Sequence, residues 1–265
     1  MKKIVLIIAS SLISVGAFAQ EGFHIGVRGG TIGSYIYNQD LSNSDKDYVE
    51  GRQKFGSSVA ITTDYHFSET VGLGVDLNFV NIGQSYIYYN SGEVNATLNA
   101  NYMRIPLLLH FNSDPNSGVM FKGFFGPQIS LLNKATLTNT YKAGASAEDP
   151  LIDISSNGDT TILLDRAGFA TSSTINGGGD VTARMENMTI GAILGMGMAI
   201  NATDFMNIEL GVVLGYEFTD AGTPFVGVDV PGIDGDFLYD VGAPTASPTN
   251  IINAGFNLGI NFIIN

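Results

Sequence analysis

The chain has 265 residues, of which 45% are hydrophobic, with 33 glycines and no cysteine. Without cysteine it can form no disulfide, thiolate metal site, thiol nucleophile or lipoprotein anchor. The 12 basic residues against 25 acidic residues give a net charge of −13, which argues against a nucleic-acid partner.

Residues 1–19 have the pattern of a secretory signal peptide. Two lysines and an apolar run precede Ala17-Phe18-Ala19, a small-residue cleavage site. We therefore predict cleavage after Ala19 and a single mature domain over residues 20–265. That domain keeps 10 basic and 25 acidic residues, a net charge of −15. No later stretch has the roughly 18 consecutive apolar residues that a spanning helix needs.

Eight segments of the mature chain are predicted to be β-strands. In each segment apolar residues alternate with small or polar ones, the period of two that separates the faces of a strand. The last segment is the clearest, because Phe256, Leu258 and Ile260 alternate with Asn257 and Gly259. The predicted strands are 23–37, 54–67, 71–88, 97–111, 119–135, 184–200, 205–218 and 254–264.

The connections between these strands alternate in length. The short connections are 68–70, 112–118 and 201–204, and the long ones are 38–53, 89–96, 138–180 and 219–249. This alternation is typical of outer-membrane barrels, which have short periplasmic turns and long extracellular loops. We therefore predict an all-β protein, an eight-stranded antiparallel up-and-down transmembrane β-barrel in the outer membrane. Its apolar strand faces contact lipid, whereas in the alternative, a soluble ligand-binding barrel, they would face inward.

Aromatic residues gather near the predicted strand ends, as expected for the aromatic belts of a membrane barrel. At the long-loop ends these are Tyr35, Tyr37, Tyr86, Tyr88, Tyr89, Tyr102 and Tyr216. At the short-turn ends they are Tyr65, Phe67, Phe111, Phe121, Phe205 and Phe262. We predict that both groups lie at the membrane interfaces.

The strand faces predicted to point inward carry nine charges. They are Arg28, Lys54, Arg104, Lys122 and Lys134, with Asp64, Asp76, Glu209 and Glu217. Nine charges in a soluble core would be costly, but the lumen of an outer-membrane barrel is polar. Because eight strands leave a bore that side chains can fill, we predict a closed lumen tied by salt bridges. A narrow ion or proton path is the alternative.

The three histidines, His24, His66 and His110, are also predicted to face inward near the periplasmic mouth. We expect them to be polar lining, hydrogen-bonded to Asp64 and the backbone. A metal or catalytic cluster would need all three to converge, and the fourth strand lies far round the ring from the first two. No histidine is predicted to face outward and no G-x-S-x-G motif occurs, which disfavours a membrane-surface hydrolase. We expect no enzymatic activity and no cofactor.

The four long connections hold 16 of the 25 acidic residues. Asp229, Asp234, Asp236 and Asp240 are weak candidates for Ca²⁺ ligands. Their spacing does not fit an EF-hand loop, so we interpret them as a solvated acidic loop and expect no bound metal. The connection 138–180 is too long for a simple turn, and we expect it to extend the barrel wall or to form a binding edge.

Four stretches resemble PorT-like outer-membrane β-barrel proteins, a group also described as porin-family proteins. The most specific is Tyr102–His110, which is similar to the family's fourth strand. Weaker matches are Gly26–Gly30, Leu77–Gly83 and Gly126–Gln128. Arg104 stands where the family usually has Glu, and His110 where it has Lys or Arg, so a reversed ion pair in the lumen is expected. The resemblance implies an outer-membrane barrel and supplies no catalytic residues.

The predicted role is structural, or interaction at the cell surface through the acidic loops 138–180 and 219–249. The predicted partners are outer-membrane lipid and an extracellular protein or glycan, with no nucleic acid, and the predicted oligomeric state is a monomer. The alternative function is a narrow channel or an accessory of a protein secretion system.

Overall fold

The computed structural model describes residues 22–38, 49–68, 70–89, 92–113, 119–143, 174–203, 205–222 and 248–264. Within these ranges the chain is almost entirely β-structure, and no helix is long and apolar enough to cross a bilayer. The strands are β1 (Phe23–Asn38), β2 (Val49–His66), β3 (Val71–Tyr89), β4 (Gly92–Asn112), β5 (Val119–Ala143), β6 (Thr174–Asp180), β7 (Met188–Thr203), β8 (Met206–Glu217) and β9 (Thr249–Ile264). A single 3₁₀ turn, Thr182–Arg184, lies between β6 and β7.

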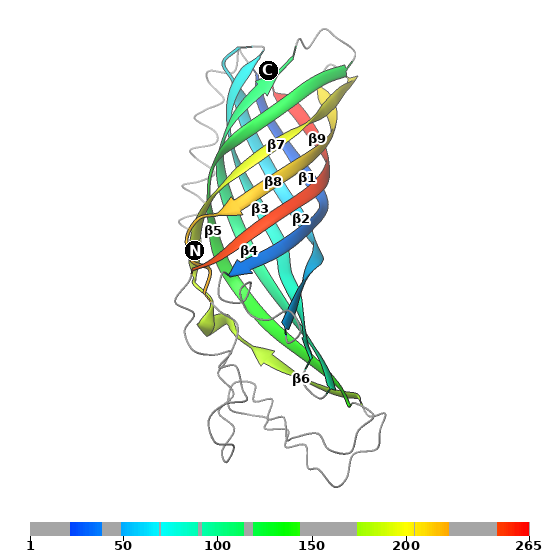
Figure 1. The fold of residues 1–265 in the computed structure, drawn as a ribbon. Helices are drawn as coiled ribbons and strands as arrows, with labels where there is room; N and C mark the ends of the chain where they lie inside the picture. The colour runs from blue at the N-terminus through cyan, green and yellow to red at the C-terminus, as the bar shows by residue number, and fades with distance from the viewer. Residues whose placement is uncertain are drawn as a thin grey trace, which may run out of the picture.

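Eight of these strands close into a barrel, seen from the side in Figure 1. Each pairs antiparallel with the next around the ring, and β1 pairs with β9 from Phe23 opposite Ile264 to Asn38 opposite Thr249. Closure satisfies the backbone hydrogen bonds between strands, a requirement for any β-structure that spans a bilayer. The predicted eight-stranded antiparallel barrel is therefore confirmed.

The alternation of side chains separates an apolar outer face from a polar lumen. On β9, Phe256 and Leu258 are 67% and 58% exposed, whereas Asn257 is 8% exposed and points into the barrel. Polar side chains lie close against the inner wall of the barrel. A Cβ atom on Gly26 of β1 would lie only 1.7 Å from Asn261 Oδ1 of β9, so no larger residue fits there without a shift of that side chain.

The strands at the long-loop end run further than the sequence pattern predicts. Residues 89–96, expected to be a long loop, mostly continue the β3–β4 ladder, in which Tyr89 pairs with Glu93. Likewise β5 reaches Ala143 and pairs with β6 over Thr136–Lys142, within the expected loop 138–180. These extensions project beyond the rest of the barrel (Figure 1). Conversely, β7 starts at Met188, because the preceding residues form the 3₁₀ turn.

The aromatic residues at the long-loop end do not all contact the surroundings of the barrel. Tyr35 and Tyr37 are each 39% exposed on the outer face, in line with a belt, but Tyr86 and Tyr102 are each 2% exposed. Tyr102 is part of an apolar cluster inside the barrel. The belt prediction is therefore wrong for these two residues, because they occupy lumen positions of β3 and β4.

If the apolar face contacts lipid, a charge at its middle should destabilise the barrel. Leu210 projects from the middle of β8 and is 55% exposed. We predict that Leu210→Arg costs about 2–4 kcal/mol of unfolding free energy in lipid vesicles, because a guanidinium there loses its hydration. Urea titration monitored by tyrosine fluorescence measures the change.

The matched control is Ala202→Arg, at an exposed position in the β-bulge of β7 next to the short turn. An arginine near the membrane interface should cost only about 0–1 kcal/mol of unfolding free energy. Equal stability of the Leu210→Arg variant and the unmodified protein would contradict the assignment of this face to lipid.

Candidate functional site

The inside of the barrel is the candidate site, because seven of the nine predicted lumen charges meet there. The seven are Arg28, Asp64, Asp76, Arg104, Lys122, Glu209 and Glu217. They come from β1, β2, β3, β4, β5 and β8, so their contacts cross the bore between strands far apart in sequence.

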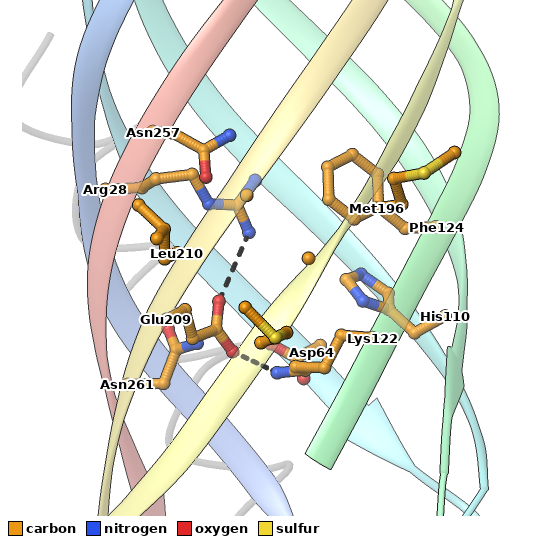
Figure 2. A pocket seen from close by; sticks show the side chains of 13 residues that line it. Arg28, Asp64, His110, Lys122, Phe124, Met196, Glu209, Leu210, Asn257 and Asn261 are labelled. Carbon is orange, nitrogen blue, oxygen red and sulfur yellow. Dashed lines mark hydrogen bonds and ion pairs between the residues drawn. The ribbon is translucent and has the colours of Figure 1, made fainter. Parts of the chain in front are cut away.

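A layer of four charges crosses the bore between the middle and the short-turn end. Arg28 Nη1 donates a hydrogen bond to Asp76 Oδ2 at 3.5 Å, and Arg28 Nη2 lies 3.8 Å from Glu209 Oε2. Lys122 donates to Glu209 from the opposite wall, and Figure 2 shows Arg28, Glu209 and Lys122 pointing toward one another. The four formal charges cancel, so the layer is neutral although it is buried.

The space beside this layer is small. The Arg28 guanidinium carbon lies 5.0 Å from the centre of the Phe124 ring, a distance suited to a cation–π contact. The cavity lined by Arg28, Asp64, Lys122 and Glu209 measures about 20 Å³, enough for roughly one water molecule. Little space for water therefore remains beside this layer.

A second buried ion pair lies nearer the long-loop end. Arg104 Nη2 is 3.2 Å from Glu217 Oε1, and the two side chains are 2% and 0% exposed. Gln128 and Ser130 each donate to Glu217 Oε1 at 2.8 Å. On the other side, Arg104 Nη1 donates to Asn253 Oδ1 at 3.3 Å. Arg104 of β4 thus pairs inside the barrel with an acid from β8.

Apolar residues close the barrel beyond this pair. The cluster comprises Ile32, Ile36, Val80, Ile82, Leu98, Ala100, Tyr102, Ala135, Val181, Met185, Ala221 and Ile251. Val181 and Met185 come from the segment between β6 and β7, which is fixed to the barrel rim by the bond from Val181 N–H to the Ala135 carbonyl. The sequence pattern did not reveal this cap, and it assigned residues 184–187 to the predicted strand 184–200, whereas β7 begins at Met188.

Hydrogen bonds fix the start of the capping segment. The hydroxyl and the backbone N–H of Thr182 both donate to Asp180 Oδ1, at 2.6 and 2.9 Å. These two bonds lower the pKa of the Asp180 carboxyl from its ordinary value. Thr182 also reaches the barrel wall, where the Ala135 N–H donates to its hydroxyl at 2.9 Å.

Two of the predicted lumen charges lie on the outer face instead. On β5, Lys134 pairs with Asn101, but Leu132 pairs with Tyr102, so one extra residue, Asn133, bulges out between them. A bulge of one residue reverses the alternation beyond it, and Lys134 is consequently exposed.

Lys54 lies beside a similar irregularity in the β2–β3 ladder, between Gln53 and Ser58. Its ammonium group donates to the side chains of Asn81 and Asn99. Those asparagines alternate with the lumen residues of β3 and β4, so they lie on the outer face. Lys54 therefore crosses the outside of β3 rather than entering the lumen.

The three histidines converge, contrary to the expectation that the fourth strand would keep His110 apart. His66 Nε2 is 2.7 Å and His24 Nδ1 is 3.2 Å from the same oxygen, Asp64 Oδ2. The centres of the His66 and His110 rings are 6.0 Å apart. Gly72 of β3 pairs with both residues, and its lack of a side chain lets the two rings approach each other over that strand.

The acidic residues considered for Ca²⁺, Asp229, Asp234, Asp236 and Asp240, lie outside the described residues. Among the described residues, the group with suitably close metal-ligand atoms is His24, Asp64 and His66. The acidic residues expected in loops partly belong to strands, since Glu50 lies in β2 and Glu93 in β4.

Comparison with known proteins gives a family match. The family model described as "Outer membrane protein beta-barrel domain" matches residues 18–221. A search of curated proteins returns no match.

Solved structures resemble the chain at low identity. Neisserial surface protein A is 12% identical, with 91% of this chain and 96% of that chain covered and a TM-score of 0.40. OprG from Pseudomonas aeruginosa is 10% identical, with 92% and 96% covered and a TM-score of 0.42. Ail of Yersinia pestis, solved in complex with the heparin analogue sucrose octasulfate, is 10% identical, with 92% and 100% covered and a TM-score of 0.37.

The buried Arg104–Glu217 pair gives a test of the lumen network. Replacing Arg104 by Met leaves the Glu217 carboxylate buried without a cation, which should cost about 3–5 kcal/mol of unfolding free energy. Urea unfolding in lipid vesicles measures the loss. The double variant Arg104→Met/Glu217→Gln removes both charges and should recover most of it. Additive losses in the double variant would show that the two residues do not interact.

Proposed function

Because the chain belongs to the outer membrane protein beta-barrel domain family, we propose that it is a non-conducting, non-enzymatic barrel that acts through its extracellular surface. As an outer-membrane barrel, it has its short turns in the periplasm and its long connections outside the cell by the general rule for this architecture. The finer likeness to PorT-like barrels, carried by Tyr102–His110, belongs to this proposal, as do cleavage after Ala19 and the monomeric state.

The observation that carries the proposal is the filling of the bore at three successive levels. From the periplasmic end these are the Arg28–Asp76–Glu209–Lys122 layer, the Arg104–Glu217 pair and the apolar cap. A hydrated ion would have to break charge pairs that have little water to replace them, and then cross an apolar layer. Each step carries a desolvation cost, which supports a closed barrel.

The surface role is supported by the charge of the two longest connections between described strands. Residues 144–173 and 223–247 contain nine acidic residues and one basic residue, Arg166. Such a surface attracts cationic partners and repels polyanions. Of the two ligand classes expected from the sequence, an extracellular protein with a basic patch is therefore favoured over an acidic glycan.

The alternative role, a narrow channel or secretion accessory, has one feature in its favour. The small cavity beside Arg28 and Glu209 is lined in part by charged groups, as an ion path would be, although Phe124 and two methionines also line it. Conductance distinguishes the two roles, because a path open at rest must carry current.

We predict that the full chain, inserted into planar lipid bilayers, shows no steady single-channel openings. Insertion is verified by protease protection in vesicles made from the same preparation. The variant Arg28→Ala/Glu209→Ala removes one charge of each sign from the lower layer, and we expect it to stay silent as well, because the Arg104–Glu217 pair and the apolar cap still close the bore. Steady openings by the unmodified protein would sink the closed-barrel proposal and favour the channel.

The surface role predicts salt-sensitive binding through the acidic connections. In the loop variant, the nine acidic residues of 144–173 and 223–247 are replaced by Asn or Gln, with every strand unchanged. The variant should lose at least about tenfold in affinity for the basic protein recovered by cross-linking at the surface of intact cells. Surface plasmon resonance at low and physiological salt measures the difference. Equal binding by both forms would exclude these loops as the contact surface.

A further inference from the structure

The buried polar cluster at the periplasmic mouth has a composition unlike the ion-pair layers above it. His24, Asp64 and His66 are 9%, 4% and 5% exposed. One ligand atom from each residue lies within 4.8 Å of the other two. The two histidine rings lie face to face at a tilt of 32°, with their centres 4.6 Å apart. Both rings thus direct a nitrogen to the same carboxylate oxygen.

Hydrogen bonding within the protein does not satisfy this cluster. His24 Nδ1 lies 3.2 Å from Asp64 Oδ2, yet its alignment does not make a hydrogen bond, and His110 Nε2 has no partner at all. His110 is 4% exposed, so water does not compensate freely for the missing bond. The side-chain nitrogen Nδ2 of Asn112 lies 3.3 Å from His66 Nδ1. The oxygen of the same amide, Oδ1, also has no hydrogen-bond partner. Buried polar atoms in this condition are uncommon and mark a place where a water molecule or an ion can bind.

The backbone of β3 leaves space for this arrangement. A Cβ atom on Gly72 would lie 2.8 Å from His66 Nδ1, and one on Gly74 would lie 2.6 Å from His110 Nε2 and 3.1 Å from Asp64 Cβ. Both imidazole rings and the Asp64 side chain therefore pack against bare backbone. The two glycines bring nitrogen atoms from β2 and β4 to one side of Asp64.

These features fit a divalent transition-metal ion. Two imidazole nitrogens and one carboxylate oxygen form a common protein ligand set for Zn²⁺, with a fourth position open. Ligand atoms about 2.0–2.1 Å from a tetrahedral zinc ion are about 3.4 Å apart. His24 Nδ1 and His66 Nε2 lie 3.2 and 2.7 Å from Asp64 Oδ2, so a small shift of the His66 side chain is needed to admit the ion. We propose that His24, Asp64 and His66 bind one divalent transition-metal ion at the periplasmic mouth, beside the unpartnered nitrogen of His110.

The surrounding charges are compatible with a bound cation. Lys122, which lines the same cavity as Asp64 and His110, donates to Glu209, so its charge is largely compensated. The cluster lies at the very ends of two strands, because β1 begins at Phe23 and β2 ends at His66. An ion from the periplasm can therefore reach it without crossing the ion-pair layers. Imidazole-rich sites favour Zn²⁺, Cu²⁺ or Ni²⁺ over Ca²⁺ and Mg²⁺.

The proposal goes beyond the surface role and does not depend on it. Full-length protein in detergent, stripped with chelator, is titrated with Zn²⁺ at neutral pH in an isothermal calorimeter. We expect one ion per chain with saturable binding, and a Zn²⁺-dependent rise in melting temperature because the ion binds only the folded state. Titration with Co²⁺ should give the visible absorption of a four-coordinate site, a signal that weak binding to carboxylates alone does not produce.

The variants His24→Gln and His66→Gln should each lower the affinity by more than the roughly 10–100-fold that loss of a residue supporting a ligand costs. The double variant His24→Gln/His66→Gln should abolish binding of one ion per chain, although it retains all 25 acidic residues. Asn257→Ser is the matched control, since it alters a buried lumen residue of β9 outside the cluster, and it should bind as the unmodified protein does. Circular dichroism and the gel-mobility shift between boiled and unboiled samples establish that each variant is folded.

Two results would overturn the proposal. One is the absence of saturable Zn²⁺ binding by the unmodified, folded protein. The other is equal Zn²⁺ affinity and an equal melting-temperature rise in the unmodified protein and the double variant, which would place the ion on the acidic loops. If the double variant does not fold, Asp64→Asn, which keeps the size of the side chain, replaces it with the same two criteria.

Discussion

The structure depends on the closure of the β1–β9 ladder. Once the first strand pairs with the last along its full length, the ring has no free strand edge, and the backbone can enter a bilayer without unpaired polar groups. Closure also fixes the faces, because successive side chains must point alternately to lipid and to the bore. Every charge on an inward face then has to find its partner within a space that eight strands leave barely open.

The lumen meets that requirement by pairing charges between strands that are not adjacent in the ring, rather than along one strand. Arg28 and Asp76 come from β1 and β3, Lys122 and Glu209 from β5 and β8. Such contacts connect strands that are not neighbours in the ring. Side chains on the outer, lipid-exposed face cannot make contacts of this kind. Because burial removes both charges from water, each ion pair adds little net stability. The main effect of these pairs is therefore to fix the side chains that fill the bore.

The sequence predicted the eight strands of the barrel, their alternation and the closed ring, because period-two patterning survives along most of each barrel strand; β6, within the predicted loop 138–180, was not predicted. It failed where the ladder departs from that period. The bulge at Asn133 reverses the faces of β5, so Lys134 lies outside, and the irregularity after Gln53 has the same effect on Lys54. An extra residue in one strand is defined only by its partner strand, so a single sequence cannot reveal it.

The histidine cluster is another feature that the sequence pattern did not predict. Counting strands around the ring separates His110 from His24, but it ignores side-chain reach and the space above a glycine. At Gly72 and Gly74 the wall has no side chains, so groups from the flanking strands meet over β3. The glycines that alternate with apolar residues on this strand are therefore not neutral spacers. They decide which polar groups of the neighbouring strands come together, and hence where a barrel with a filled bore keeps unpaired ligand atoms.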